Sequence, residues 1–378
     1  MRLPLTLHRL WAIVLKEFVQ MRRDRITFAM MVGIPLMQLV LFGFAINTDP
    51  KRLPTVVFDA DHSAFSRSFV AGLDNSGYFD ILPPPDSVVA AREAMAIGDI
   101  QFIVSIPPDF SRAVVRGERP ALLLEADASD PSATGNALAA LANLNQSALQ
   151  HDLKGPLVKL NGGSPPFEVR VQRNYNPEGI TQYNIVPGLM GTILTMTMIM
   201  MTGMAMTREL ERGTLENLLA FPVHPLEVMI GKILPYIIVG YIQVTVILTA
   251  AHVLFHVPIA GSLPMLLACV LVFLAANLTV GMMFSTIARS QLQAMQMTFF
   301  FFLPSMLLSG FMFPFRGMPH WAQVIGEGLP LTHFLRIVRG IMLKGNGWAE
   351  TWPNVWPLLV FMAVVLTIGF KRYRRTLD

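Results

Sequence analysis

The chain has 378 residues, of which 53% are hydrophobic and 14% are charged, whereas about 25% are charged in a typical soluble protein. This deficit excludes a disordered tail protein and argues against an ordinary soluble enzyme. The net charge of +4 does not indicate a nucleic-acid binder, because the basic residues flank apolar runs and form no single patch. Cys269 is the only cysteine, which excludes an intrachain disulfide and a multi-cysteine metal site.

Six apolar runs contain no Asp, Glu, Lys or Arg and reach or approach the roughly 20 residues that a helix needs to cross a bilayer. They cover residues 26–46, 183–206, 233–255, 263–287, 294–313 and 353–370. We expect helices, because lipid offers unpaired backbone groups no partner. The sequence therefore predicts an α-helical membrane protein with six transmembrane helices, the third of which extends over 229–256.

Basic residues beside the apolar runs predict the orientation, because short cytoplasmic flanks are enriched in Lys and Arg. Residues 1–25 contain six of them, the tail 371–378 contains four, and the loop 256–262 contains none. We therefore expect both termini in the cytoplasm, which requires an even number of spans. The segment 314–352 opposes this rule, because it is expected outside yet carries four cations. They are Arg316, Arg336, Arg339 and Lys344.

Half of the charged residues lie in residues 47–182, between the first and second spans. Strand-like pieces alternate there with helix-like pieces. We predict strands at 54–58, 78–82, 102–106, 121–124 and 167–172, and helices at 63–73, 86–97 and 131–153, with Ser63 as the N-cap of the first helix. This order predicts a mixed α/β domain with partly parallel strands, which the orientation places on the extracytoplasmic side.

Asp59, Asp61 and His62 follow the first predicted strand and invite a metal interpretation. A metal site needs further ligands in a defined geometry. We favour a solvated turn that leads into a capped helix. The chain shows no nucleophile elbow and no convincing Ser/His/Asp arrangement.

The segment 207–228, between the second and third spans, carries a dense cluster of charge, with five charged residues among the ten from 207 to 216. Thr214 is a plausible N-cap, Glu216 then falls in the first helical turn, and Pro222 ends the helix. The pattern predicts a short amphipathic helix on the cytoplasmic surface. Such a helix can insert its apolar face into a groove of a partner or lie passively among lipid headgroups, and the residues alone favour neither.

The run from Arg208 to Glu216, followed by Leu218-Leu219-Ala220 and Pro222, resembles the signature of ABC-2 type transporter permeases. The resemblance is closest to the bacterial branch that exports drugs and lipids and has a large external domain after the first span. Residues 1–25, with Lys16-Glu17-Phe18, resemble the amphipathic N-terminal helix of that family. Residues 304–311 resemble its fifth span, and residues 330–340, within 314–352, resemble its external re-entrant segment.

The resemblance implies a permease without an ATPase of its own, and the phosphate-cradling pattern Gly-x4-Gly-Lys-[Ser/Thr] is missing from the chain. A separate ATPase subunit, in two copies, would bind ATP and Mg, so that this chain needs no cofactor and is not an enzyme. A second permease half, identical or homologous, is implied as well, and a periplasmic membrane-fusion adaptor is an open option. The expected location is the bacterial inner membrane.

In the family, residues 208–220 act as the coupling helix that docks on the ATPase. The resemblance therefore assigns the coupling contacts to one cluster of residues. They are Glu209, Glu211, Arg212, Gly213, Thr214, Leu215, Glu216 and Leu218.

The candidate substrate path comprises Met196, Met200, Phe300 and Pro304, because methionine adapts its shape to varied apolar surfaces. Packing against lipid explains these residues equally well. No ionised side chain lies within the predicted spans, which argues against an ion-coupled carrier. The leading hypothesis is ATP-driven export of a hydrophobic or amphiphilic compound. The alternative is a mechanical transmitter, in which ATP binding inside rearranges the external domain and no cargo crosses.

Overall fold

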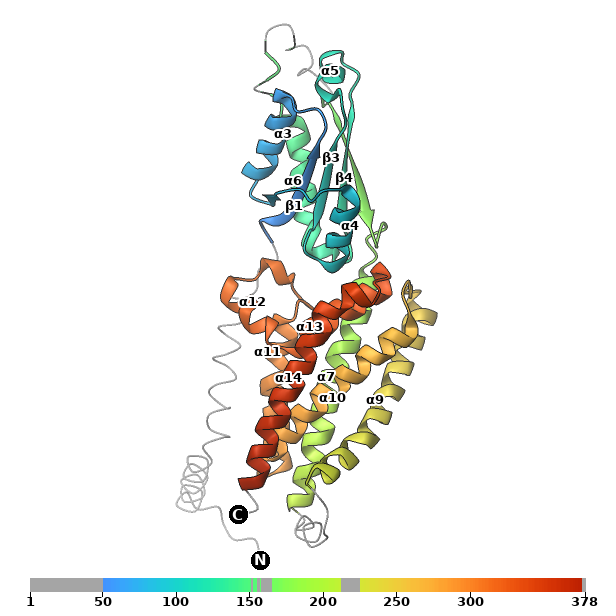
Figure 1. Cartoon of the computed structure of the whole chain (residues 1–378), viewed down its shortest axis with the longest axis vertical. Helices are drawn as coiled ribbons and strands as arrows, with labels where there is room; N and C mark the ends of the chain where they lie inside the picture. The colour runs from blue at the N-terminus through green and yellow to red at the C-terminus, as the bar shows by residue number, and fades with distance from the viewer. Residues whose placement is uncertain (1–49, 151, 155–156, 158–164, 212–224, 376–378) are drawn as a thin grey trace, which may run out of the picture.

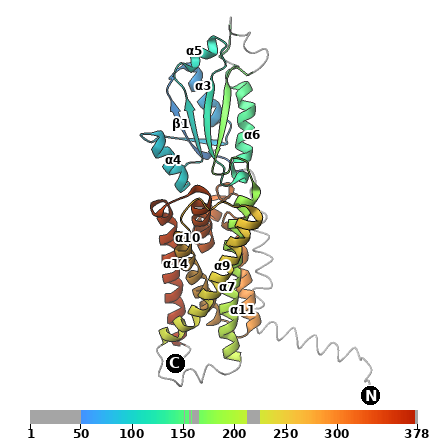
Figure 2. The ribbon, with the colours of Figure 1, turned by 90° about the vertical axis from the view of Figure 1, so that its right-hand side faces the viewer.

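The computed structural model describes residues 50–150, 152–154, 157, 165–211 and 225–375. An α/β domain lies at one end of a bundle of long helices (Figures 1 and 2). The predicted first span at 26–46, the predicted N-terminal helix and residues 212–224 of the predicted coupling loop lie outside the described residues.

The α/β domain is built on a five-stranded sheet in the order β2-β1-β3-β4-β5. The strands are β1 (Leu53–Asp59), β2 (Phe79–Leu82), β3 (Phe102–Ile106), β4 (Ala121–Asp127) and β5 (Glu168–Asn174). All neighbours pair in parallel except β3 and β4, which are antiparallel. The prediction of a mixed domain with partly parallel strands is confirmed.

Four helices pack against this sheet. They are α3 (Ala64–Asn75), α4 (Val88–Ile97), α5 (Phe110–Val115) and α6 (Pro131–Ser147). Helices α3, α5 and α6 share one apolar core with the sheet, which includes Phe69, Phe110 and Phe167. Helix α4 packs separately, through Ala91 and Met95. Helix α6 ends at Ser147, before the predicted end at 153, and a turn follows it.

The segment after β1 is a hydrogen-bonded turn. One carboxylate oxygen of Asp59 accepts the backbone N–H groups of Asp61 (3.0 Å) and His62 (3.1 Å). Asp61 accepts the N–H of Ser111 at 3.1 Å. Ser63 caps α3 in a reciprocal capping box with Ser66, as predicted for the N-cap. Within the described ranges no three His, Cys, Asp or Glu side chains are grouped to hold a metal.

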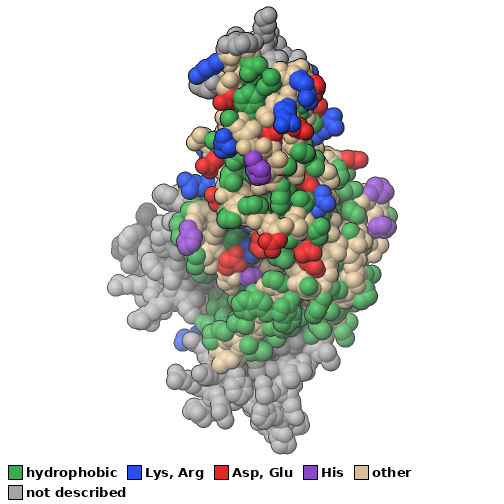
Figure 3. All heavy atoms as spheres, turned by 45° about the horizontal axis from the view of Figure 1, so that its top comes forward, with side chains coloured by type: hydrophobic (Ala, Val, Ile, Leu, Met, Phe, Trp, Pro, Cys, Tyr) green, Lys and Arg blue, Asp and Glu red, His purple; other side chains and the backbone are tan. Residues whose placement is uncertain are grey.

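Among the described residues, four helices are long and apolar enough to cross a membrane. They are α7 (Thr181–Glu211), α9 (Pro225–Phe255), α10 (Leu263–Ser285) and α14 (Trp348–Arg375). They contain the predicted second, third, fourth and sixth spans. The charged surface of the α/β domain gives way to a largely apolar surface over the bundle (Figure 3).

The predicted fifth span, 294–313, corresponds to α11 (Gln291–Leu308). The helix is shorter than expected because Gly310 adopts a left-handed conformation with φ of 83°, which turns the chain. Glutamines in its first two turns lower its hydropathy, so α11 is not among the four helices. Six spans therefore remain a prediction.

Three other helix boundaries also differ from expectation. Helix α7 continues past 206 to Glu211, and α9 begins at Pro225, so both extend into the predicted loop 207–228. Helix α14 begins at Trp348 instead of 353, and Pro353 and Pro357 lie inside it. Glu350 stabilises this earlier start, because it accepts the N–H of Gly347 at 2.8 Å and places an acid in the first turn.

The segment between α11 and α14 is compact. It contains η3 (Phe315–Gly317), α12 (His320–Glu327), α13 (Pro330–Arg339) and the π-helical turn η4 (Gly340–Lys344). Helix α13 is buried along most of its length, and Phe334 stacks on Phe273 of α10 with the ring centroids 3.8 Å apart. The segment thus enters the apolar core of the bundle while also facing the α/β domain (Figure 1).

Helices α7 and α10 approach closely at two glycines. A Cβ atom added to Gly281 would lie 2.6 Å from the carbonyl oxygen of Ile199 and 2.9 Å from Cβ of Thr202. A Cβ on Gly203 would lie 3.5 Å from the carbonyl oxygen of Gly281. Because small residues allow helix backbones to approach in a membrane, these glycines determine the spacing of the two helices.

We therefore predict that Gly281→Ala lowers the stability of the chain by about 1–3 kcal/mol, because the added methyl group forces the two backbones apart. Gly135→Ala in α6 is the matched control, since its Cβ would meet no atom within 4 Å and alanine favours a helix over glycine by about 1 kcal/mol. Thermal unfolding of both purified variants tests this contrast. An unfolding temperature of Gly281→Ala equal to or above that of Gly135→Ala would contradict the close packing.

Candidate functional site

The last turn of α7 lies at the end of the bundle away from the α/β domain (Figure 1). Glu211 accepts the backbone N–H of Gln291 at 2.9 Å and the side-chain amide of Gln291 at 2.6 Å. Gln291 is the first residue of α11, whose free N–H groups and dipole favour an acid at this position. The side-chain hydrogen bond from Gln291 is the main reason that the pKa of Glu211 is lowered. Glu211 thus links the end of α7 to the start of α11.

The structure describes little of the predicted coupling cluster. Glu209 lies on α7, and Glu211 bonds Gln291. The other predicted contacts lie outside the described residues. They are Arg212, Gly213, Thr214, Leu215, Glu216 and Leu218. The coupling assignment therefore remains a prediction.

The candidate substrate path also remains a prediction. Met196 and Met200 are half-buried in α7, and Phe300 of α11 is 42% exposed. Pro304 lies inside α11. The cavity described next contains none of these four residues.

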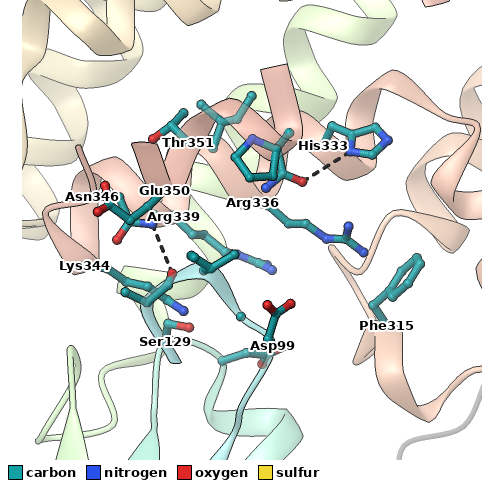
Figure 4. A pocket seen from close by; sticks show the side chains of 18 of the residues that line it. Asp99, Ser129, Phe315, His333, Arg336, Arg339, Lys344, Asn346, Glu350 and Thr351 are labelled. Carbon is teal, nitrogen blue, oxygen red and sulfur yellow. Dashed lines mark hydrogen bonds between the residues drawn. The ribbon is translucent and has the colours of Figure 1, made fainter. Parts of the chain in front are cut away.

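A cavity of about 620 Å³ lies where the α/β domain meets the segment between α11 and α14. We call it the junction cavity. Asp99, Ser129 and neighbouring residues form its domain wall, and residues of α12, α13 and α14 form its bundle wall (Figure 4). Four cations line it, and they are the ones that opposed the charge rule. They are Arg316, Arg336, Arg339 and Lys344.

Lys344 joins the bundle to the domain. Its ammonium group lies 2.6 Å from a carboxylate oxygen of Asp127 at the end of β4 and donates to the carbonyl of Met95 at 3.2 Å. Both side chains are buried, at 8% and 3% exposure. Asn346 reinforces the contact through the carbonyl of Ala96 at 3.0 Å. Asn184 at the start of α7 bonds Asp130 of the domain at 3.1 Å.

The acids of β4 explain why Lys344 is needed. Glu125 and Asp127 are two residues apart on one strand and therefore share a face of the sheet. Arg92 of α4 binds Glu125 through two hydrogen bonds of 2.9 and 2.8 Å, and this contact is the main reason that the pKa of Glu125 is lowered. Asp127 receives its cation from the bundle instead. The domain thus compensates one buried acid itself and depends on η4 for the other.

The remaining cavity cations differ in how they are satisfied. Arg336 forms a two-pronged ion pair with Glu327, at 2.6 and 3.0 Å. Arg316 donates to the backbone carbonyls of Gly98 and Asp99. Arg339 donates to the carbonyl of Gly310 at 3.1 Å. The sequence analysis identified these cations only as an exception to the cytoplasmic preference of basic residues. The excess of acidic over basic residues in 47–182 is the sequence feature that could have predicted their contact with the α/β domain.

Helices that are long and apolar enough to cross a bilayer make this a membrane protein, and its architecture is that of a helical permease with a mixed α/β domain. The chain belongs to the ABC-2 transporter family, because the model of that family, described as ABC-2 family transporter protein, matches residues 25–371. ABC-2 permeases generally work with an ATPase subunit.

Curated relatives match over nearly the whole chain. The probable multidrug ABC transporter permease YbhR of Escherichia coli is 28% identical over 97% of this chain and 99% of its own. The probable multidrug ABC transporter permease YbhS of that organism is 28% identical over 99% of both chains. Its inner membrane transport permease YhhJ is 29% identical over 90% of this chain and 93% of its own. No solved structure matches.

We predict that Lys344→Met destabilises the protein by about 3–5 kcal/mol, because it leaves the carboxylate of Asp127 buried without its cation. The double variant Lys344→Met/Asp127→Leu should recover most of this loss, since a buried ion pair can be replaced by apolar groups. Arg116→Met is the control, because Arg116 pairs with Glu118 at an exposed site. Thermal unfolding of the purified chain measures all three. A loss for Lys344→Met no larger than that of the control would show that the ion pair does not hold the domain.

Proposed function

We propose that this chain is the membrane-spanning permease subunit of an ABC export complex. A separate ATPase subunit hydrolyses ATP, and the permease couples that reaction to the outward movement of a hydrophobic or amphiphilic compound, drug-like or lipid-like. The membership of the ABC-2 family supports the transporter role. The relatives YbhR and YbhS, which are probable multidrug ABC transporter permeases, support transport of more than one compound.

The continuous course of α7 carries this proposal. The helix runs for 31 residues from Thr181, just after β5 of the α/β domain, to Glu211 at the far end of the bundle. Glu211 bonds the start of α11, and the glycine contact packs α7 against α10. A push on the segment 212–224 that follows would therefore act on α7, α10 and α11 together.

The proposed complex contains two copies of the ATPase and a second permease half, identical or homologous. ATP and Mg are bound by the ATPase, so that the permease itself holds no cofactor and catalyses no reaction. The complex lies in a bacterial inner membrane with both termini of this chain in the cytoplasm, which leaves the α/β domain free to meet a periplasmic adaptor. Half-buried Met196 and Met200, with Phe300 and Pro304, remain the proposed substrate path.

We predict that Glu216→Lys, or replacement of Gly213 and Thr214 by alanine, reduces ATP-dependent efflux about tenfold, within the usual range of coupling free energies. The reason is that these changes alter the charge and the start of the predicted coupling helix. Glu178→Lys, an exposed acid beside the α/β domain, is the matched control. The measurement is efflux from cells with equal membrane levels of each variant. Undiminished efflux in Glu216→Lys would refute the assignment.

The buried attachment of the α/β domain favours a second candidate function, the mechanical transmitter. Because Lys344 and Asn346 tie the domain to the bundle, a rearrangement of the helices would move the domain as well. ATPase activity in proteoliposomes separates the two hypotheses. Stimulation by an exported compound supports the exporter, whereas activity that ignores such compounds, together with a stable extracytoplasmic partner, supports the transmitter.

A further inference from the structure

The junction cavity contains two arginines, Arg316 and Arg339, that form no ion pair among the described residues. Arg336 is neutralised by Glu327 and Lys344 by Asp127. Arg339 bonds only a carbonyl, and its Nε and one terminal nitrogen are buried with no hydrogen-bond partner among the described residues. An arginine cannot lose its proton in a protein, so these donors remain charged and require an acceptor.

Burial disfavours the charge of both arginines, and neighbouring acids offset this only in part. Asp130 and Asp127 favour the charge of Arg339, and Asp99, Asp127 and Glu327 favour that of Arg316. Loss of contact with water is the largest influence on the pKa of Arg339, and it lowers that pKa. The pKa of Arg316 is lowered for the same reason, with a second contribution from the nearby charge of Arg336. Figure 4 shows Arg339 extending from α13 toward the domain wall that carries Asp99, whereas Arg336 extends toward Phe315. Arg316 and Arg339 are the cavity cations available to an anionic ligand, because guanidinium groups bind phosphate through charge-assisted hydrogen bonds.

Acidic groups line the same space. Asp99 is exposed in the domain wall. Glu350 of α14 accepts the backbone N–H of Gly347, which is a neutral donor. A ligand with negative charge alone would compete with these carboxylates for the cavity arginines, because Asp99 already favours the charge of Arg316. A ligand that carries both a phosphate and an ammonium group would complement the basic side chains and the acidic side chains of the cavity. The volume of the cavity, about 620 Å³, lies within the roughly 300–1,000 Å³ typical of small-ligand pockets.

One side of the cavity continues into an apolar surface. Trp356 lines the cavity and is 51% exposed. Exposed apolar side chains continue along α14 at a spacing of four residues, in a stripe that winds gradually around the helix because four residues turn it by about 400°. They are Trp348, Trp352, Val360, Val364 and Ile368. Tryptophans are enriched where a membrane meets water, so this stripe passes from the interface into the hydrocarbon. An acyl chain can lie along it while its headgroup occupies the cavity.

We propose that the junction cavity binds the headgroup of a zwitterionic phospholipid. The phosphate contacts Arg339 and Arg316, and the ammonium group lies near the carboxylates of Asp99 and Glu350. The acyl chains lie along the exposed apolar side chains of α14. The lipid thereby bridges the α/β domain and the bundle next to the Lys344–Asp127 ion pair. This proposal does not depend on ATP coupling or on the direction of transport.

The test is mass spectrometry of the intact full-length protein in detergent, with phosphatidylethanolamine and phosphatidylglycerol supplied in equal amounts. We expect one phosphatidylethanolamine per chain to be retained about tenfold more tightly than phosphatidylglycerol, a difference of about 1.4 kcal/mol. Arg339→Gln should reduce that retention about tenfold. The matched control is Arg170→Gln, an exposed arginine on β5, which should bind as the wild type does.

A second variant and a soluble probe complete the test. Asp99→Asn removes an exposed carboxylate, leaves the backbone carbonyl that Arg316 contacts, and should abolish the preference for phosphatidylethanolamine over phosphatidylglycerol. Soluble phosphoethanolamine should compete if the headgroup alone is recognised, whereas failure to compete assigns the recognition to the intact lipid. Equal retention of the two lipids by the wild-type chain, or unchanged binding by both Arg339→Gln and Asp99→Asn, would overturn the proposal.

Discussion

The arrangement of this molecule depends on the compensation of one buried negative charge. Asp127 lies at the end of a central strand of the α/β domain, and its cation, Lys344, comes from the turn between α13 and α14. Removal of either partner leaves a buried charge with a penalty of several kcal/mol. The ion pair therefore holds the α/β domain and the bundle in a defined relation. Within the described residues, the chain itself joins them at the short stretch between β5 and α7. The Tyr175 ring lies beside the same ammonium group, at 5.2 Å, and burial raises the pKa of Tyr175 to about 12.

Helix α7 carries this attachment to the opposite end of the bundle. Its first turns bond the domain through Asn184, its middle packs on α13 and α10, and its last turn meets α11 through Glu211. Gly191 allows the close contact with α13, because a Cβ there would lie 2.8 Å from Leu331. Tightly packed elements move together and deform little. Helix α7 thus joins the two ends of the bundle through packed and hydrogen-bonded contacts.

The segment between α11 and α14 resolves a conflict within the sequence. Its four cations conflict with the predicted external position of the segment, because basic residues prefer the cytoplasmic side, and the structure gives two of them carboxylate partners, Glu327 and Asp127. The other two face the junction cavity. The charge rule describes short flanks that meet the membrane surface. It does not describe a compact segment whose cations bind carboxylates and backbone carbonyls of the segment itself and of the α/β domain, as they do here.

The sequence by itself determined the helical membrane class, because the backbone groups of a long apolar run in lipid can form hydrogen bonds only within their own helix. It also determined the mixed α/β region, because the patterns that predict strands and helices are local. It also located the N-cap Ser63, whose hydrogen bonds span only three residues. Tertiary structure alone decided that Lys344 pairs with Asp127, two residues separated by more than two hundred positions, since side-chain pattern carries no signal at such a separation. The junction cavity likewise follows from packing between distant segments, whereas the early start of α14 and the end of α11 depend on local features, the hydrogen bond from Gly347 to Glu350 and the left-handed Gly310.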